Sequence, residues 1–204
     1  MTETAEGTAF GRLRAEVAAH RSNAWATELG WEPLVVGSER SRMLIVSQAP
    51  GRRAQASGVP FDDASGALLR QWLGVSDEEF YDADRVAIVP MDFYYPGKAA
   101  SGDAPPRPGF AELWHPQVLE LLGDVRLTVL VGAYAQRRYL GAERGRTLTD
   151  TVREAGTRLP LFPIVHPSPL TRGWRVRNPW FEGETVPRLR GLVRDALEGA
   201  HGSA

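Results

Sequence analysis

Cysteine is absent from this 204-residue chain, and lysine is nearly absent, since Lys98 is the only one. Without cysteine the chain can form no disulfide, no thiolate metal site and no cysteine nucleophile. No run of apolar residues is long enough to span a bilayer. The N-terminus also lacks the apolar core of a signal peptide. We therefore expect a cytoplasmic protein that has no membrane partner.

A strong net charge is also missing, because 24 basic and 25 acidic residues leave a formal charge of −1. Any contact with a nucleic acid must therefore rest on a local basic surface. Hydrophobic residues make up 43% of the chain, which is enough for one sizeable core. We expect a single domain over residues 1–204, and a monomer.

Apolar runs and helical patterns alternate along the chain. Short apolar runs typical of buried strands occupy residues 43–46, 86–89, 127–131 and 161–165. Helical spacing is found at residues 10–21 and 110–122, after Gly132, and from Thr185 onward. This alternation predicts an α/β protein, a three-layer α/β/α sandwich with a four-stranded parallel sheet.

The most informative stretch follows the last of these strands and reads His166-Pro167-Ser168-Pro169-Leu170. A histidine at the carboxyl end of a parallel strand lies where such sheets bind ligands. The prolines stiffen the loop, and Leu170 is expected at its tip, a position suited to insertion between bases. Three arginines suited to phosphate groups come next: Arg172, Arg175 and Arg177. The alternative is a proline-rich turn whose histidine is satisfied internally.

A second motif, Ser47-Gln48-Ala49-Pro50-Gly51, follows the first strand. Its glycine lets the backbone approach a ligand closely, and no Gly-Lys-Ser/Thr follows to make it a phosphate loop. Asp62 and Asp63 are the only carboxylates near it. Asp63 or Ser65 could instead cap the next helix, and for either aspartate this reading competes with catalysis.

Both motifs carry a family resemblance. The His166 stretch closely resembles the histidine motif of the uracil-DNA glycosylase superfamily, where it forms a minor-groove loop. The second motif resembles the Gly-Glu-Ala-Pro-Gly form of the iron-sulfur branch, with Ser47 and Gln48 in place of glycine and glutamate. Without cysteine, however, the chain cannot hold that cluster. The resemblance covers roughly residues 43 to 195 and implies the same three-layer fold, with damaged DNA as partner.

The resemblance also implies roles for individual residues. Phe61 would stack on the flipped base, with the backbone of Ala49, Pro50 and Gly51 beside it; a core aromatic is the alternative for Phe61. Ser168 and Leu170 would contact DNA with the three arginines. The place of the family's base-reading asparagine falls near Val89, which cannot read an amide edge. Asp92, Tyr94 or backbone groups could substitute, and we name Asp92 as the candidate.

Cleaving an N-glycosidic bond sends negative charge to the base and leaves a positive sugar for water to attack. His166 can donate a hydrogen bond to the departing base even when it is neutral. A carboxylate would stabilise the sugar and position water, with Asp63 first and Asp62 next. Asp63-Ala64-Ser65-Gly66 resembles a pattern in some cysteine-free glycosylases. Gln48 can orient water or hold the base, and no step needs a metal or cofactor.

We therefore expect a DNA glycosylase that removes uracil or another deaminated base. Two alternatives remain: a non-catalytic protein that binds damaged DNA, and a hydrolase of free nucleosides or nucleotides. The Gly- and Pro-rich residues 98–108 are expected to form a mobile connector. Their alternative role is a loop against the DNA backbone. His115 is expected to be a packed or surface histidine.

Overall fold

A four-stranded parallel sheet forms the centre of the computed structural model, which describes residues 8–199. The strand order is β2-β1-β3-β4, and every neighbouring pair is parallel. The strands are β1 (Met43–Val46), β2 (Val86–Ile88), β3 (Leu127–Val131) and β4 (Leu161–Ile164). Strand positions and direction confirm the predicted fold class.

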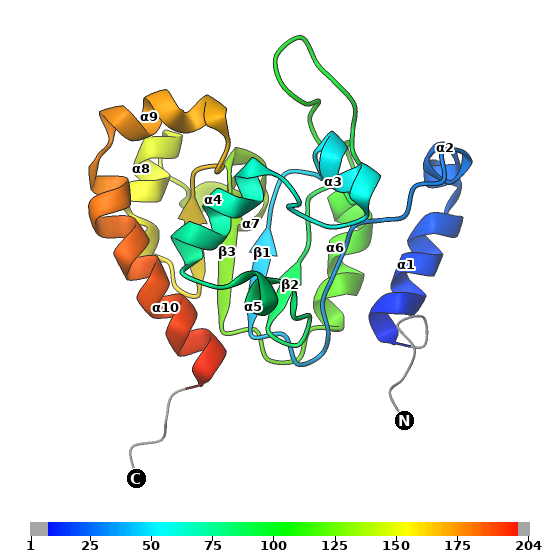
Figure 1. Cartoon of the computed structure of the whole chain (residues 1–204), viewed down its shortest axis with the longest axis horizontal. Coiled ribbons are helices and arrows are strands. Elements are labelled where there is room, and N and C mark those ends of the chain that lie inside the picture. Colours follow the sequence, from blue (N-terminus) through cyan, green and yellow to red (C-terminus); the bar gives the residue numbers. More distant parts are fainter. Residues whose placement is uncertain (1–7, 200–204) are drawn as a thin grey trace.

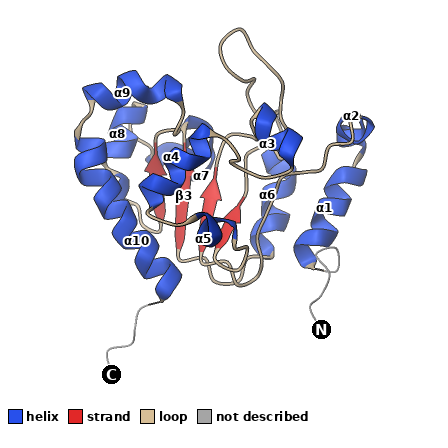
Figure 2. Cartoon of the chain, viewed as in Figure 1, coloured by secondary structure: helices blue, strands red, loops and turns tan. Residues whose placement is uncertain are grey.

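Helices cover both faces of this sheet (Figures 1 and 2). They are α1 (Ala9–Ala19), α2 (Ala24–Glu28), α3 (Arg52–Ser57), α4 (Ala64–Leu73), α5 (Asp77–Tyr81), α6 (Phe110–Glu120), α7 (Ala133–Leu140), α8 (Leu148–Arg153), α9 (Arg172–Arg177) and α10 (Val186–Glu198). Three short helices, α2, α8 and α9, lie outside the segments in which the sequence shows helical spacing. Within the described range no helix is long and apolar enough to cross a membrane.

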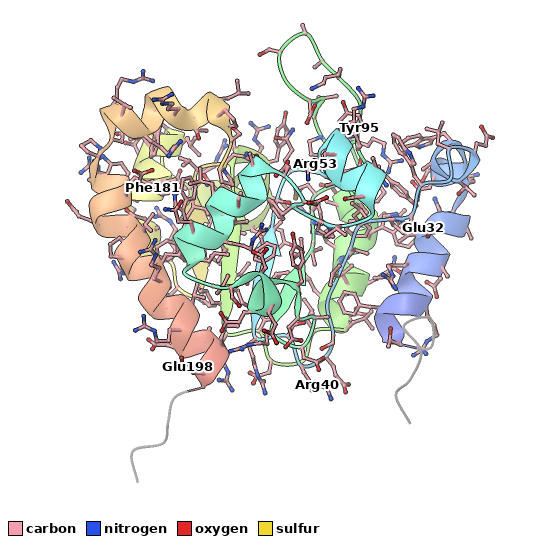
Figure 3. All side chains as sticks on the ribbon, viewed as in Figure 1. Glu32, Arg40, Arg53, Tyr95, Phe181 and Glu198 are labelled. Atoms are coloured by element: carbon pink, nitrogen blue, oxygen red, sulfur yellow. The ribbon has the colours of Figure 1, made fainter. Side chains whose placement is uncertain are left out.

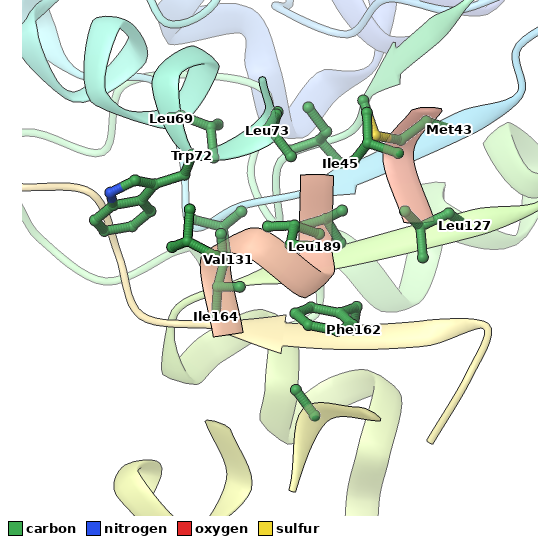
Figure 4. Close-up of a cluster of buried hydrophobic side chains, with 14 of the residues drawn as sticks. Met43, Ile45, Leu69, Trp72, Leu73, Leu127, Val131, Phe162, Ile164 and Leu189 are labelled. Carbon is green, nitrogen blue, oxygen red and sulfur yellow. The ribbon is translucent and has the colours of Figure 1, made fainter. Parts of the chain in front are cut away.

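Side-chain alternation along the strands divides the core into two layers, because successive side chains point to opposite faces of a sheet. Met43 and Ile45 face a cluster built with α4 and α10, whereas Leu44 and Val46 face one built with α1 and α6. Figure 4 shows the first cluster, in which Leu189 of α10 packs beside the strands. All four β1 residues are buried, which explains why the strand is apolar throughout.

The carboxyl ends of the strands all lie at one edge of the sheet. Helices α3 and α9 lie at this edge, as does the long loop between β2 and α6 (Figure 1). In the side-chain view, Arg53 and Tyr95 lie at this end of the molecule, while Arg40 and Glu198 lie at the opposite end (Figure 3). The two sequence motifs, at the exits of β1 and β4, are therefore brought to the same edge.

Candidate active site

His166 follows β4 and lies against the backbone of Gly132, where β3 turns into α7. A Cβ atom added to Gly132 would lie 3.5 Å from the Cβ of His166 and 3.7 Å from its Cδ2. Gly132 has a φ of 83°, a conformation that favours glycine. This close strand–helix turn thus makes room for the imidazole.

The imidazole of His166 has no hydrogen-bond partner among residues 8–199, while its own carbonyl accepts a 2.8 Å bond from the hydroxyl of Thr171. Burial lowers the pKa of His166, and the carboxylates of Asp63 and Asp103 oppose that shift. A lowered pKa keeps the ring neutral at pH 7, with one N–H free to donate. The alternative of an internally satisfied histidine does not describe this ring.

The loop after His166 is tied by Thr171, whose hydroxyl also donates to the carbonyl of Ser168 at 2.8 Å. A short 3₁₀ turn over Pro169–Thr171 follows. Leu170 lies on this turn with 79% of its surface exposed, the largest exposed fraction of any large hydrophobic residue in the described range. Leu170 therefore lies on a loop that is tied by hydrogen bonds, with its side chain exposed to solvent.

Asp63 serves as the N-cap of α4, since its Oδ1 accepts a 2.9 Å hydrogen bond from the amide of Gly66. The capping prediction is therefore confirmed. Its Oδ2 has no partner among the described residues and lies 3.5 Å from where a Cβ of Gly51 would be. Asp62, in contrast, turns outward to Arg53 at 3.5 Å. Of the two candidates, Asp63 is the carboxylate whose charge reaches His166.

Phe61 has a φ of 58°, and it is the only non-glycine residue with positive φ among those described. A Cβ on Gly66 would lie 1.8 Å from the carbonyl oxygen of Phe61, so only glycine fits there. The half-buried ring of Phe61 packs edge-on against Phe80, with 6.0 Å between centroids. Rare backbone conformations of this kind concentrate at functional sites. Ala49, Pro50 and Gly51 link β1 to α3 nearby.

The burial and hydrogen bonds of Asp92 argue against its predicted role in base binding. It is completely buried, and its two oxygens accept hydrogen bonds from Arg107 Nε at 2.7 Å and Nη2 at 2.8 Å. The amides of Arg107 and Tyr94 add bonds of 3.1 Å each. Arg107 also donates to the side chain of Asn23 at 2.8 Å. Asp92 therefore joins the β2 exit to the N-terminal helices.

The three arginines of the predicted DNA contact divide into two kinds. Arg175 turns inward, donates to Glu182 at 2.7 Å and lies over the ring of Trp72, so that only 19% of its side chain is exposed. Arg172 and Arg177 are exposed and have no ion-pair partner in the described part of the chain. Of these three arginines, only Arg172 and Arg177 are therefore exposed without an ion pair.

Residues 97–109, which precede α6, contact both the loop after β4 and the exit of β1. A Cβ on its Gly102 would lie 3.7 Å from Cδ1 of Leu170. Its Ala104 carbonyl accepts a 3.2 Å hydrogen bond from Nε2 of Gln48. Asp103, between them, is held by Lys98 at 2.9 Å and by the Tyr95 hydroxyl at 3.4 Å. We call residues 97–109 the covering loop.

The sequence did not single out Asp103. A Gly- and Pro-rich composition says that a segment is irregular, but not what it touches. Its charge nevertheless acts on His166. His115, by contrast, is buried and bonded on both ring nitrogens, as a packed histidine should be. No group of three or more His, Asp or Glu side chains in residues 8–199 is arranged to hold a metal ion.

A three-layer α/β protein with an unbonded histidine, a carboxylate and an exposed leucine at the strand ends has the features of a candidate nucleic-acid enzyme. The family model of the uracil DNA glycosylase superfamily matches residues 34–190, well over half of the chain. The chain belongs to this superfamily. Membership supports a DNA glycosylase-like function with DNA as the partner, and α1 and α2 lie outside the matched range.

Proposed function

We propose that this protein hydrolyses the N-glycosidic bond of uracil, or of another deaminated base, in DNA. The observation that carries the proposal is the imidazole of His166, which is neutral and unbonded at the carboxyl end of β4. A preorganised donor of this kind favours a transition state in which negative charge develops on the base. Because a neutral imidazole still carries one N–H, the ring can donate this hydrogen bond without a positive charge.

Asp63 complements His166 from the other motif. As the bond to the base breaks, the sugar gains positive charge, which a nearby carboxylate stabilises. The free Oδ2 of Asp63 can also accept a proton from the attacking water. The hydrogen bond from Gly66 to Oδ1 holds the carboxylate in one orientation while this occurs. The water adds to the sugar carbon, and the base leaves with the bonding electrons.

Leu170, Arg172 and Arg177 support duplex DNA as the substrate. Extruding a base costs a few kcal/mol of stacking and pairing, and an apolar side chain can fill the gap. The exposed arginines follow the wedge directly, where they can bind the phosphates on either side of an extruded nucleotide. A hydrolase of free nucleosides would have no use for this wedge.

A cleavage panel tests the proposal. Oligonucleotides that carry uracil, hypoxanthine or xanthine, single- and double-stranded, are incubated with the protein, and abasic sites are counted. We expect cleavage of at least one of them, with Leu170→Ala losing more activity on duplex than on single strands. Leu113→Ala is the matched control, because Leu113 is exposed on α6 and outside the site. Absence of cleavage in every arm would refute the proposal.

A second candidate is a protein that binds damaged DNA without cutting it. Buried Val89 at the place of the family's base-reading asparagine, and Gln48 in place of glutamate, favour this candidate. It predicts tighter binding to a duplex with uracil than to the undamaged duplex, and no abasic product. The same panel, read by binding as well as by cleavage, separates the two.

A further inference from the structure

Residues 102–104 of the covering loop connect Gln48 to the loop that follows β4. Gly102 approaches Leu170 and Ala104 accepts the hydrogen bond from Gln48. Residues two apart have Cα atoms at most about 7 Å apart. The covering loop therefore contacts both the side chain of Gln48, from the exit of β1, and Leu170, on the loop that follows β4.

The bond to Ala104 settles the orientation of the Gln48 amide. A backbone carbonyl only accepts hydrogen bonds, so the group facing it must be the NH₂ and not the oxygen. Turning the amide over would place two acceptors against each other. One N–H of Nε2 and the whole of Oε1 remain without a partner among residues 8–199. Gln48 thus presents one donor and one acceptor in a known order.

Several hydrogen bonds position the covering loop. The carboxylate of Asp103 accepts from both Lys98 and the hydroxyl of Tyr95. The backbone amide of Tyr95 in turn donates to Oε1 of Gln55 at 2.9 Å, which ties the start of the loop to α3. Ala104 also donates to the carbonyl of Gly97 at 2.9 Å. The carbonyl of Ala104, which orients Gln48, therefore belongs to a turn that several hydrogen bonds hold in place.

We propose that Gln48, oriented by the carbonyl of Ala104, is the residue that reads the polar edge of the extruded base. This inference rests on the proposed glycosylase function. Deamination replaces an exocyclic amino donor by a carbonyl acceptor and turns the adjacent ring nitrogen from an acceptor into an N–H donor. An amide held in one orientation can pair with only one of these two donor–acceptor patterns, and it rejects a base that presents the other. In uracil, Oε1 accepts from N3–H and Nε2 donates to O4.

The test changes the base and the residue together. Single-turnover cleavage is measured on oligonucleotides with uracil or N3-methyluracil. The methyl group replaces the hydrogen of N3–H, from which Oε1 would accept a hydrogen bond. The wild type should prefer uracil on the order of tenfold to a hundredfold, the range of one good bidentate contact. Gln48→Ala, which also makes room for the methyl group, should lower the uracil rate. Because the amide is gone, the two rates should then lie within about threefold of each other.

Two further variants make the result decisive. Gln48→Met keeps the length of the side chain without its hydrogen bonds and should lose the preference as well, should the alanine variant fold poorly. Gln117→Ala is the matched control, since Gln117 is half-buried on α6 and its side chain bonds only within its own helix. Retention of the wild-type preference by a folded Gln48 variant overturns the inference alone. A wild type that cleaves none of the three deaminated bases overturns the proposed function and the inference with it. A wild type that cleaves hypoxanthine or xanthine but not uracil overturns only the pairing assigned to Gln48.

Discussion

Two histidine–aspartate sets in this protein differ in how their hydrogen bonds are used. His115 donates from Nε2 to the carbonyl of Pro90 at 2.9 Å, and its Nδ1 pairs with the hydroxyl of Tyr139 at 2.8 Å. Asp92 is saturated by Arg107 and Tyr94. At the other set, the ring of His166 has no such bond in the described structure, and Asp63 uses one oxygen for its cap.

The difference separates residues that build the fold from residues that can act on a ligand. Asp92 and His115 are buried and paired, as buried polar groups in proteins nearly always are, whereas His166 and Asp63 are only partly buried. The bonded set joins the N-terminal helices and α6 to the end of β2. The unbonded set leaves a donor and an acceptor without a partner among residues 8–199. Burial lowers the pKa of both histidines, so the pKa alone would not distinguish them.

Breaking the bonded set should produce the largest change. Asp92→Ala leaves the charge of Arg107 without its partner, and breaking a buried ion pair typically costs about 3–5 kcal/mol. Denaturant unfolding should show that loss in the free energy of unfolding. Asp124→Ala is the matched control, because Asp124 pairs with arginines on the surface. A surface pair should cost less than about 1 kcal/mol. Equal losses would contradict the comparison.

Asp63→Asn should separate capping from catalysis. Asparagine caps a helix about as well as aspartate, so the melting temperature should stay close to the wild-type value. The single-turnover rate should fall on the order of a hundredfold, as for other positioned acid–base groups. Asp62→Asn serves as the control, since Asp62 faces Arg53. An unchanged rate would remove Asp63 from the mechanism and leave it a capping residue.

The arginines offer a smaller test on the DNA side. Replacing Arg172 and Arg177 together by alanine should reduce the slope of log affinity against log salt by about two units, one for each phosphate that an arginine no longer neutralises. Arg175→Ala should leave the slope unchanged, because that guanidinium is engaged by Glu182 and Trp72. Binding titrations at several salt concentrations measure both. A change of slope in Arg175→Ala instead would reverse the assignment.

The smallest expected effect concerns pH. Because folding lowers the pKa of His115 and His166, the unfolded chain binds more protons below about pH 6.5. The free energy of unfolding should therefore be fully retained above that pH and should fall as the pH drops below it. Denaturation at pH 7.5 and 5.5 measures the loss, and His115→Gln should reduce it. A variant that keeps the full loss would argue against this cause.

Much of the fold could be predicted from sequence, since the strands are apolar runs bounded by loops. Met43–Val46 and Leu127–Val131 agree at both ends. Helix α8 escapes prediction because its capping box, Thr147 with Asp150, lies in a charged stretch with little apolar periodicity. The wedge and His166 could be placed because their motif is contiguous.

The rest of the site depends on contacts between distant segments. Asp92 resembles a base reader because it follows a strand, and only the structure shows that Arg107 saturates it. Arg175 could not be told from its neighbours, because which arginine turns inward depends on the helical phase of α9 against Trp72. The bond between Gln48 and Ala104 joins residues 56 positions apart. No local pattern reports such pairings.

The central claim is that the unbonded imidazole of His166 acts on the departing base. The most direct measurement is the single-turnover cleavage rate of a uracil-containing oligonucleotide by the wild type, His166→Ala and His115→Ala, with substrate affinity and melting temperature recorded for each. Loss of one such donor should lower the rate of His166→Ala on the order of a hundredfold or more, with affinity and stability little changed. His115→Ala should instead lose stability. A His166→Ala variant that keeps the wild-type rate would contradict the claim.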